Sequence, residues 1–211
     1  MEHVNTTIFE KNQEGITHVA QRIATLIGKR EAAGQKAVLS LASGRSMRDL
    51  FVELVRLHKE EGLSFKNVVV FGSYEFYPLA DKNIGSMAQI QSQLLDHIDI
   101  LPENVHTFPG DLPKETVFTF CEEYEKAIEA AGGIDIQVLG IGQCGNIAMN
   151  EPGTQPNSST RLVIMDGNSR VDAKSLFGNV AQVPTCAITL GIETILKARE
   201  VILLAFGQHK A

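Results

Sequence analysis

The 211-residue sequence lacks the features that mark several large classes of protein. Acidic residues outnumber basic ones and the net charge is −6, which argues against a nucleic-acid surface because phosphate backbones are bound by a basic face. The three cysteines are scattered and form no C-x-x-C motif, so neither a disulfide framework nor a zinc site is predicted. No apolar run approaches the length of a membrane span, and the first residues do not resemble a secretory signal. We therefore expect a cytoplasmic protein without nucleic-acid or membrane partners.

The composition, with 44% hydrophobic and 21% charged residues, is typical of a globular domain. Short apolar segments alternate with helical patterns along the chain, and no repeat or linker divides it. This alternation predicts βαβ units and a three-layer, doubly wound α/β fold with a mostly parallel, Rossmann-like sheet. The predicted helices are 10–33, 47–61, 86–98, 112–131 and 192–198, and the predicted strands are 37–42, 67–71, 134–139, 161–165, 187–189 and 201–206.

The most informative segment is the glycine-rich turn after the strand at 134–139. It reads Gly-Ile-Gly-Gln-Cys-Gly-Asn-Ile-Ala-Met-Asn-Glu-Pro-Gly over 140–153, and an irregular stretch continues to residue 160. Loops at the carboxyl ends of parallel strands are where open α/β sheets bind ligands. The opening G-x-G-x-x-G matches the dinucleotide-binding pattern, but that motif requires a helix directly after the third glycine, and Pro152 prevents one. We therefore predict a ligand-binding loop rather than a nucleotide site.

Two further loops follow predicted strands. Ser43, Gly44, Arg45 and Ser46 form a strand–loop–helix junction that can place backbone N–H groups and hydroxyls around an anion at a helix N-terminus. Ordinary N-capping by Ser46 explains the same residues equally well. The second loop, at 72–79, carries two candidate chemical groups side by side, the phenol and the carboxylate of Tyr74 and Glu75.

These segments resemble the glucosamine-6-phosphate deaminases, which belong with the 6-phosphogluconolactonases to one sugar-phosphate isomerase superfamily. The turn at 140–153 is similar to the family pattern G-x-G-x-D/T-G-H-I-x-F-N-E-P, and the segment 71–79 is similar to F-N-x-D-E-Y-x-x-L. The resemblance runs from about residue 8 to the end of the sequence. It implies a single deaminase-like domain over 1–211 that is expected to lack the family's C-terminal segment.

The resemblance also implies a reaction, the conversion of glucosamine 6-phosphate to fructose 6-phosphate and ammonia by acid–base groups, with no cofactor and no metal. Tyr74 stands where the family has the acid that removes the carbon-bound proton, and Glu75 matches the acid beside it. Cys144 replaces another acid, Asn146 replaces the ring-opening histidine, and Glu151 matches the family's glutamate.

The phosphate-binding positions match in part: the family's phosphate-binding arginine falls at about Ser175, next to Lys174, so that contact is lost or shifted by one residue. By the same resemblance, the substrate phosphate would contact the turn at Ser43, Gly44, Arg45 and Ser46, together with Lys210 after the last predicted strand. The implied ligand is a hexose or hexosamine 6-phosphate, and a homo-oligomer is left open.

The replaced groups predict a loss of activity. A phenol has an unperturbed pKa of about 10 against about 4 for a carboxylate, so Tyr74 is mostly protonated at neutral pH and simply fills the pocket. Cys144 has no partner histidine placed by the sequence and is interpreted as an inert small residue. We therefore expect a weak or inactive sugar-phosphate-binding homologue, a pseudoenzyme. The alternatives are another sugar-phosphate reaction, such as 6-phosphogluconolactone hydrolysis, and a non-catalytic assembly subunit.

Overall fold

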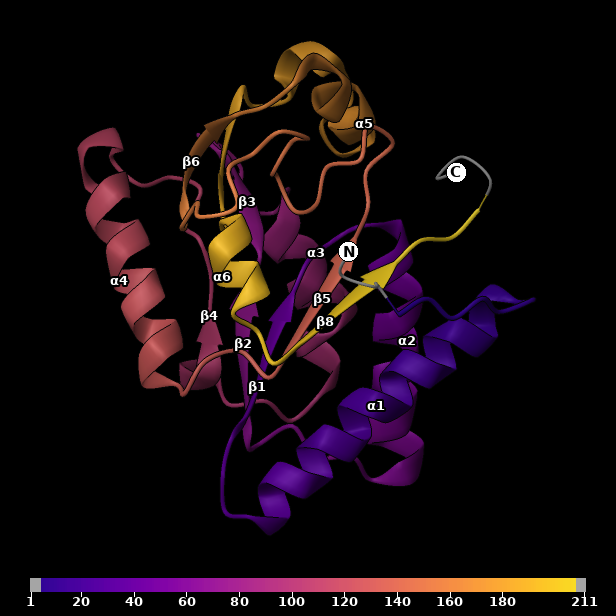
Figure 1. The fold of residues 1–211 in the computed structure, drawn as a ribbon. Helices are drawn as coiled ribbons and strands as arrows, with labels where there is room; N and C mark the ends of the chain where they lie inside the picture. The colour runs from indigo at the N-terminus through magenta and orange to yellow at the C-terminus, as the bar shows by residue number, and fades with distance from the viewer. Residues whose placement is uncertain (1–4, 208–211) are drawn as a thin grey trace.

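The computed structural model describes residues 5–207 and has the predicted α/β architecture, built around a five-stranded parallel sheet (Figure 1). The strand order is β4-β2-β1-β5-β8. The strands are β1 (Ala37–Leu41), β2 (Val68–Gly72), β4 (Val105–His106), β5 (Ile136–Gly140) and β8 (Glu200–Leu204). Every residue of β1 and β2 is buried, as expected for apolar strands in a parallel sheet covered on both faces.

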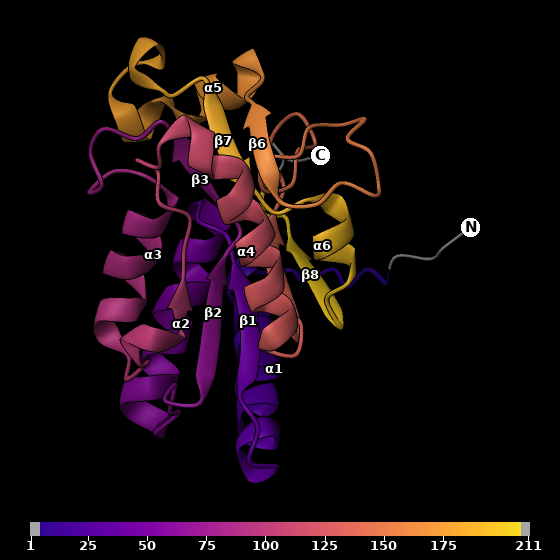
Figure 2. The same cartoon turned by 90° about the vertical axis from the view of Figure 1, so that its left-hand side faces the viewer.

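Helices cover both faces of this sheet (Figure 2). The chain runs from β1 through β2 to β4 at one edge and then returns to β5 and β8, so right-handed crossovers place the helices of the two halves on opposite faces. One face carries α1 (Asn12–Ala32), α2 (Arg45–Glu61) and α3 (Ser86–Gln93), and the other carries α4 (Val117–Ala130) and α6 (Ile192–Leu196). Short 3₁₀ turns lie at Leu95–His97, Pro102–Asn104, Lys114–Thr116 and Val180–Gln182.

A second, antiparallel sheet lies beyond the carboxyl ends of the parallel strands (Figures 1 and 2). It consists of β3 (Tyr74–Tyr77), β7 (Cys186–Thr189) and β6 (Arg161–Ile164) in the order β3-β7-β6, with α5 (Gly167–Phe177) beside it. Its own small core contains Phe76, Leu79, Met149, Met165, Val183 and Ala187. The sequence predicted the strands of β6 and β7 but neither this separate sheet nor β3 and α5.

The three elements that the sequence missed, β3, α5 and the two-residue strand β4, have weak local patterns. β3 begins after a single residue beyond the end of β2, so its four residues were interpreted as part of a loop. In α5 only Ser169 is buried, which leaves no apolar stripe to indicate a helix. Within residues 5–207, no helix is long and apolar enough to cross a membrane.

Candidate functional site

The N-terminus of α2 follows the turn at 43–46 and has no side-chain cap among residues 5–207. Its N-cap residue is Gly44, at φ +129°, a backbone conformation that favours glycine. The Gly44 carbonyl accepts the N–H groups of Met47 and Arg48. Among residues 5–207, no side chain caps this helix and its first turn holds no acid, so the N-capping role considered for Ser46 is not seen. The helix therefore presents free N–H groups and the positive end of its dipole, which suits an anion.

Ser43 and Tyr74 meet beside this helix end. The Ser43 Oγ and Tyr74 Oη atoms are 2.8 Å apart, and Gln89 Nε2 on α3 lies 3.5 Å from the same Ser43 oxygen. Ser43 is buried, and Tyr74 is half-buried at the start of β3, where it pairs with Thr189 of β7. Burial raises the pKa of Tyr74, and this effect outweighs the opposing hydrogen bond from Ser43. The phenol therefore stays protonated at neutral pH.

Glu75, the neighbouring acid, is buried and holds the N-terminus of α3. One carboxylate oxygen accepts the N–H groups of Phe76 and Ser86, at 2.9 and 2.8 Å, and the other accepts that of Met87 at 2.8 Å. Burial raises the pKa of Glu75, and these three bonds lower it only in part. A Cβ atom at Gly85 would lie 2.6 Å from Glu75 Oε1, so the helix can approach the carboxylate only with glycine there. The geometry gives Glu75 a structural role.

The loop at 141–153 folds onto itself. The Gly142 N–H donates to the Asn146 carbonyl at 2.8 Å, and the Asn146 side chain lies so close over Gly142 that no Cβ atom fits. Asn146 Nδ2 also donates weakly to the Ala148 carbonyl at 3.4 Å. Cys144, at the tip of the loop, is an exposed free thiol. Asn146 therefore forms hydrogen bonds that hold its own loop in shape. Cys144 lies on the surface.

Glu151, the retained acid, is held by residues that the sequence did not single out. Ser169 on α5 donates its hydroxyl to Glu151 Oε1 at 2.6 Å. The preceding Asn150 donates to the Leu190 carbonyl at 2.8 Å and accepts from Arg161 at 3.0 Å. Ser169 and Arg161 lie in elements without a recognisable motif, so nothing in the sequence could have indicated their contacts.

The structure thus brings some of the predicted site residues together. The turn at 43–46 and the loop at 141–153 leave the same edge of the sheet, because β1 and β5 are adjacent and parallel. Ser43 and Tyr74 are in direct contact, whereas Arg45 is exposed beside them. Lys210 lies outside the described residues. Within residues 5–207, no group of three or more His, Cys, Asp and Glu side chains could hold a metal ion.

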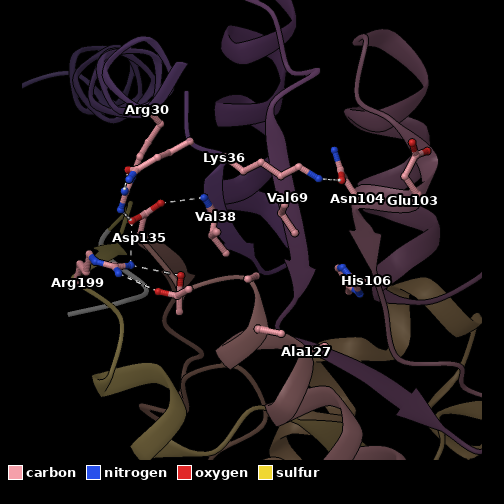
Figure 3. Close-up of a pocket in the computed structure, with 15 residues that line it drawn as sticks. Arg30, Lys36, Val38, Val69, Glu103, Asn104, His106, Ala127, Asp135 and Arg199 are labelled. Atoms are coloured by element: carbon pink, nitrogen blue, oxygen red, sulfur yellow. Dashed lines mark hydrogen bonds and ion pairs between the residues drawn. The ribbon is translucent and has the colours of Figure 1, made fainter. Parts of the chain in front are cut away.

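A cavity of about 740 Å³ lies at the opposite edge, where the parallel strands begin (Figure 3). The Asp135 carboxylate at its wall is almost fully buried and accepts from Arg30, from Arg199 at 3.0 Å and from the Val38 N–H at 2.9 Å. These bonds connect the C-terminal end of α1 with the starts of β1, β5 and β8. The cavity is lined by this structural ion-pair network and lies far from the loops that carry the candidate chemistry.

Fold and site together define the class of protein: a three-layer α/β protein whose candidate ligand-binding loops leave the carboxyl edge of a parallel sheet, where such sheets usually bind ligands. Residues 10–211 match the family model described as glucosamine-6-phosphate isomerases/6-phosphogluconolactonase. The chain belongs to this family.

Individual relatives agree with this assignment. The chain is 47% identical, over its whole length, to a glucosamine-6-phosphate deaminase-like protein of Bacteroides thetaiotaomicron, but it spans only 32% of that relative. It is 38% identical to the glucosamine-6-phosphate deaminase of Bacillus pumilus, covering 99% of this chain and 84% of the relative.

Solved structures show the same fold. A monomeric glucosamine-6-phosphate deaminase superposes with a TM-score of 0.85 at 31% identity, over 92% of this chain and 79% of its own. A 6-phosphogluconolactonase from Thermotoga maritima superposes with a TM-score of 0.71 at 22% identity, over 97% and 84% of the two chains. At that identity the second likeness concerns the fold alone.

Proposed function

We propose that this protein binds a hexose or hexosamine 6-phosphate and that its glucosamine-6-phosphate deaminase turnover is strongly reduced or lost. The observation that carries the proposal is the 2.8 Å contact between Tyr74 Oη and Ser43 Oγ. It puts a protonated phenol, in the family position of the proton-abstracting acid, directly against the candidate phosphate turn.

Binding is supported by the open end of α2. Ser43, Gly44 and Ser46 surround an uncapped helix N-terminus without a neighbouring acid in its first turn, and such helix ends favour phosphate. Arg45 is exposed at the same turn and is free to approach a bound anion. Lys210 stays a predicted additional ligand of the phosphate.

Loss of catalysis is supported by the groups that replaced the family's acid–base residues. Tyr74 keeps its proton at neutral pH because burial raises its pKa. Asn146 has an amide that does not exchange protons in this range, and Glu75 is committed to three backbone N–H groups. Each missing acid–base group typically removes about 10²–10⁴-fold of the rate. Glu151 alone leaves no group for the carbon-bound proton and none for ring opening.

Lactone hydrolysis is the weaker candidate. The segment Asn150-Glu151-Pro152 is similar to the deaminase pattern, and the similarity to the Thermotoga maritima lactonase extends only to the fold. A non-catalytic assembly subunit would be compatible with the proposed binding role.

An ammonia-release assay with glucosamine 6-phosphate tests the proposal. We expect turnover at or near background for the natural protein. The triple variant Tyr74→Asp, Cys144→Asp, Asn146→His should release ammonia orders of magnitude faster, and adding Glu151→Gln should remove the gain. Turnover at the rate of an active deaminase in the unmodified protein would contradict the proposal.

A further inference from the structure

We propose that the cavity where the parallel strands begin is a separate ligand site, which binds an elongated organic anion (Figure 3). The ligand carries an acidic group at one end and hydrogen-bond acceptors at the other, as a nucleoside monophosphate or a long dicarboxylate does. The walls of the cavity share no residue with the loops at 43–46, 72–79 and 141–153. Its volume of about 740 Å³ falls within the usual range for small-molecule sites.

The floor of the cavity crosses four neighbouring strands, β5, β1, β2 and β4. Each strand contributes a lining residue at or beside it: Asp135, Val38, Val69 and His106. Three strand spacings of about 4.8 Å separate β5 from β4, so the floor extends roughly 14 Å across the sheet. Ala127 on the covering helix α4 also lines the cavity, and its small side chain leaves the space open. The shape therefore suits a ligand that is longer than a simple inorganic anion.

One end of the cavity carries an excess of positive charge. Arg30 and Arg199 both donate to the same oxygen of Asp135, Oδ1, while its other oxygen accepts a backbone N–H. Two guanidinium groups thus share a single carboxylate. Arg199 is also held by the carbonyls of Gly132 and Gly133, at 2.8 and 3.4 Å. A guanidinium has five N–H donors, of which Arg30 uses two within residues 5–207, so donors and charge remain for an acidic group.

Lys36 places a fixed ammonium group at the other end of the cavity (Figure 3). It donates to Asn104 Oδ1 at 2.7 Å, and the buried Asn104 side chain in turn donates to the Lys66 carbonyl at 3.3 Å. In the described part of the chain no carboxylate forms an ion pair with this ammonium, and the nearby Glu103 is exposed to water. Burial and the Lys36 charge lower the pKa of His106, so its imidazole is neutral at pH 7 and can donate to a ligand.

These features together select the class of ligand. The chain as a whole has a net charge of −6, yet this hollow holds cations at both ends. Each cation is fixed by hydrogen bonds to the protein, so a ligand that binds them loses little side-chain entropy. Val38 and Val69 lie between the two ends, and they favour a hydrocarbon or ring body in the middle of the ligand (Figure 3).

Calorimetric titration with adenosine 5′-monophosphate, suberate and inorganic phosphate tests the site. Suberate is a long unbranched dicarboxylate, whereas inorganic phosphate can reach only one end of the cavity. We expect at least one of the two elongated anions to bind at least about tenfold more tightly than inorganic phosphate, because it contacts both ends. Tighter binding of the nucleotide or of suberate distinguishes the two sources of this chemistry.

Two cavity variants locate the binding. Lys36→Met removes the ammonium and keeps most of the side-chain stem, and we expect it to weaken binding of the elongated anion by about tenfold. Ala127→Leu fills the hollow without removing a polar group and should abolish this binding. Lys126→Met is the matched control, because Lys126 is exposed on α4 outside the lining of the cavity, and it should leave the affinity unchanged. Circular dichroism confirms that each variant is folded.

Two results would overturn the proposal. One is that neither elongated anion binds more tightly than inorganic phosphate to the natural protein. The other is equal affinity of the natural protein, Lys36→Met and Ala127→Leu, which would place the bound anion elsewhere, for example at the turn at 43–46. Because Lys36 is exposed, its substitution leaves the core intact, and the result stands even if Ala127→Leu does not fold.

Discussion

Replacing Glu75 by glutamine tests whether this carboxylate holds α3 in place. Glutamine has nearly the same shape, and its single carbonyl oxygen can still accept the N–H groups of Phe76 and Ser86. Its amide NH₂ would face the N–H of Met87, which now donates to Glu75 Oε2 at 2.8 Å. The substitution therefore leaves one helix N–H facing a donor.

The magnitude follows from two opposing effects. An unsatisfied buried donor costs about 1–3 kcal/mol. Removing a carboxylate whose pKa is raised by burial relieves part of its desolvation, so we expect a net loss of about 1–2 kcal/mol in the free energy of unfolding. For a chain of this length that loss corresponds to roughly 2–8 °C in Tm.

The effect should also depend on pH with a defined sign. Because the pKa of Glu75 is raised in the folded state, the folded protein binds more protons than the unfolded one between the unfolded pKa, near 4.3, and the raised folded pKa. Stability contributed by Glu75 therefore falls as pH rises through this interval. The deficit of Glu75→Gln should be largest on the acid side and become smaller as pH rises.

Urea unfolding followed by circular dichroism, repeated across this pH range, measures both quantities. Glu193→Gln is the control, because Glu193 is partly exposed and its ion-pair partner among the described residues is Lys197, one helical turn away at 3.3 Å. We expect the control to change stability by less than about 0.5 kcal/mol. If Glu75→Gln unfolds like the natural protein at every pH, the carboxylate does not hold α3 and the reasoning is refuted.

Two further predictions concern carboxylates outside the site. Asp135→Asn removes a buried negative charge that pairs with Arg30 and Arg199, and it should lower the free energy of unfolding by about 3 kcal/mol, measured by urea titration. We expect a loss at the low end of the usual range because Arg199 is half-exposed and water can solvate it once the partner is gone. Burial alone would raise the pKa of Asp99, but the hydrogen bonds from the Phe65 N–H and the Ser64 hydroxyl lower it by a larger amount. The pKa of Asp99 is therefore below its usual value. Its stabilisation should be present above the unfolded pKa, near 3.9, and be lost as pH falls through the folded value; Asp99→Asn should remove that part of the acid sensitivity, measured as Tm against pH.

Four of the five parallel strands could be predicted because each carries its own apolar signal, whereas the two-residue strand β4 carries none. The apolar runs at 37–42 and 134–139 are buried on both faces in β1 and β5, and alternation with helices implies the crossovers. The second sheet could not be predicted, because its strands pair across long separations, such as Tyr74 with Thr189. Local periodicity contains no information about such pairing.

The site was predictable in part, for a similar reason. Motif and resemblance indicated the turn at Ser43 and the position of Tyr74, but not their contact, which depends on how β3 joins β7. The resemblance also grouped Glu75 with the acids of the site, whereas the structure shows it buried against the N-terminus of α3. A carboxylate that accepts backbone N–H groups and one that acts on a substrate look the same in a sequence.

The central claim is that this family member binds a sugar phosphate without deaminating it. A ³¹P NMR time course of glucosamine 6-phosphate in the presence of the protein tests both halves of the claim in one measurement. We predict that the phosphate resonance broadens or shifts as protein is added, while no fructose 6-phosphate resonance grows. Conversion to fructose 6-phosphate at the rate of an active deaminase, or a sharp resonance unaffected by the protein, would contradict the claim.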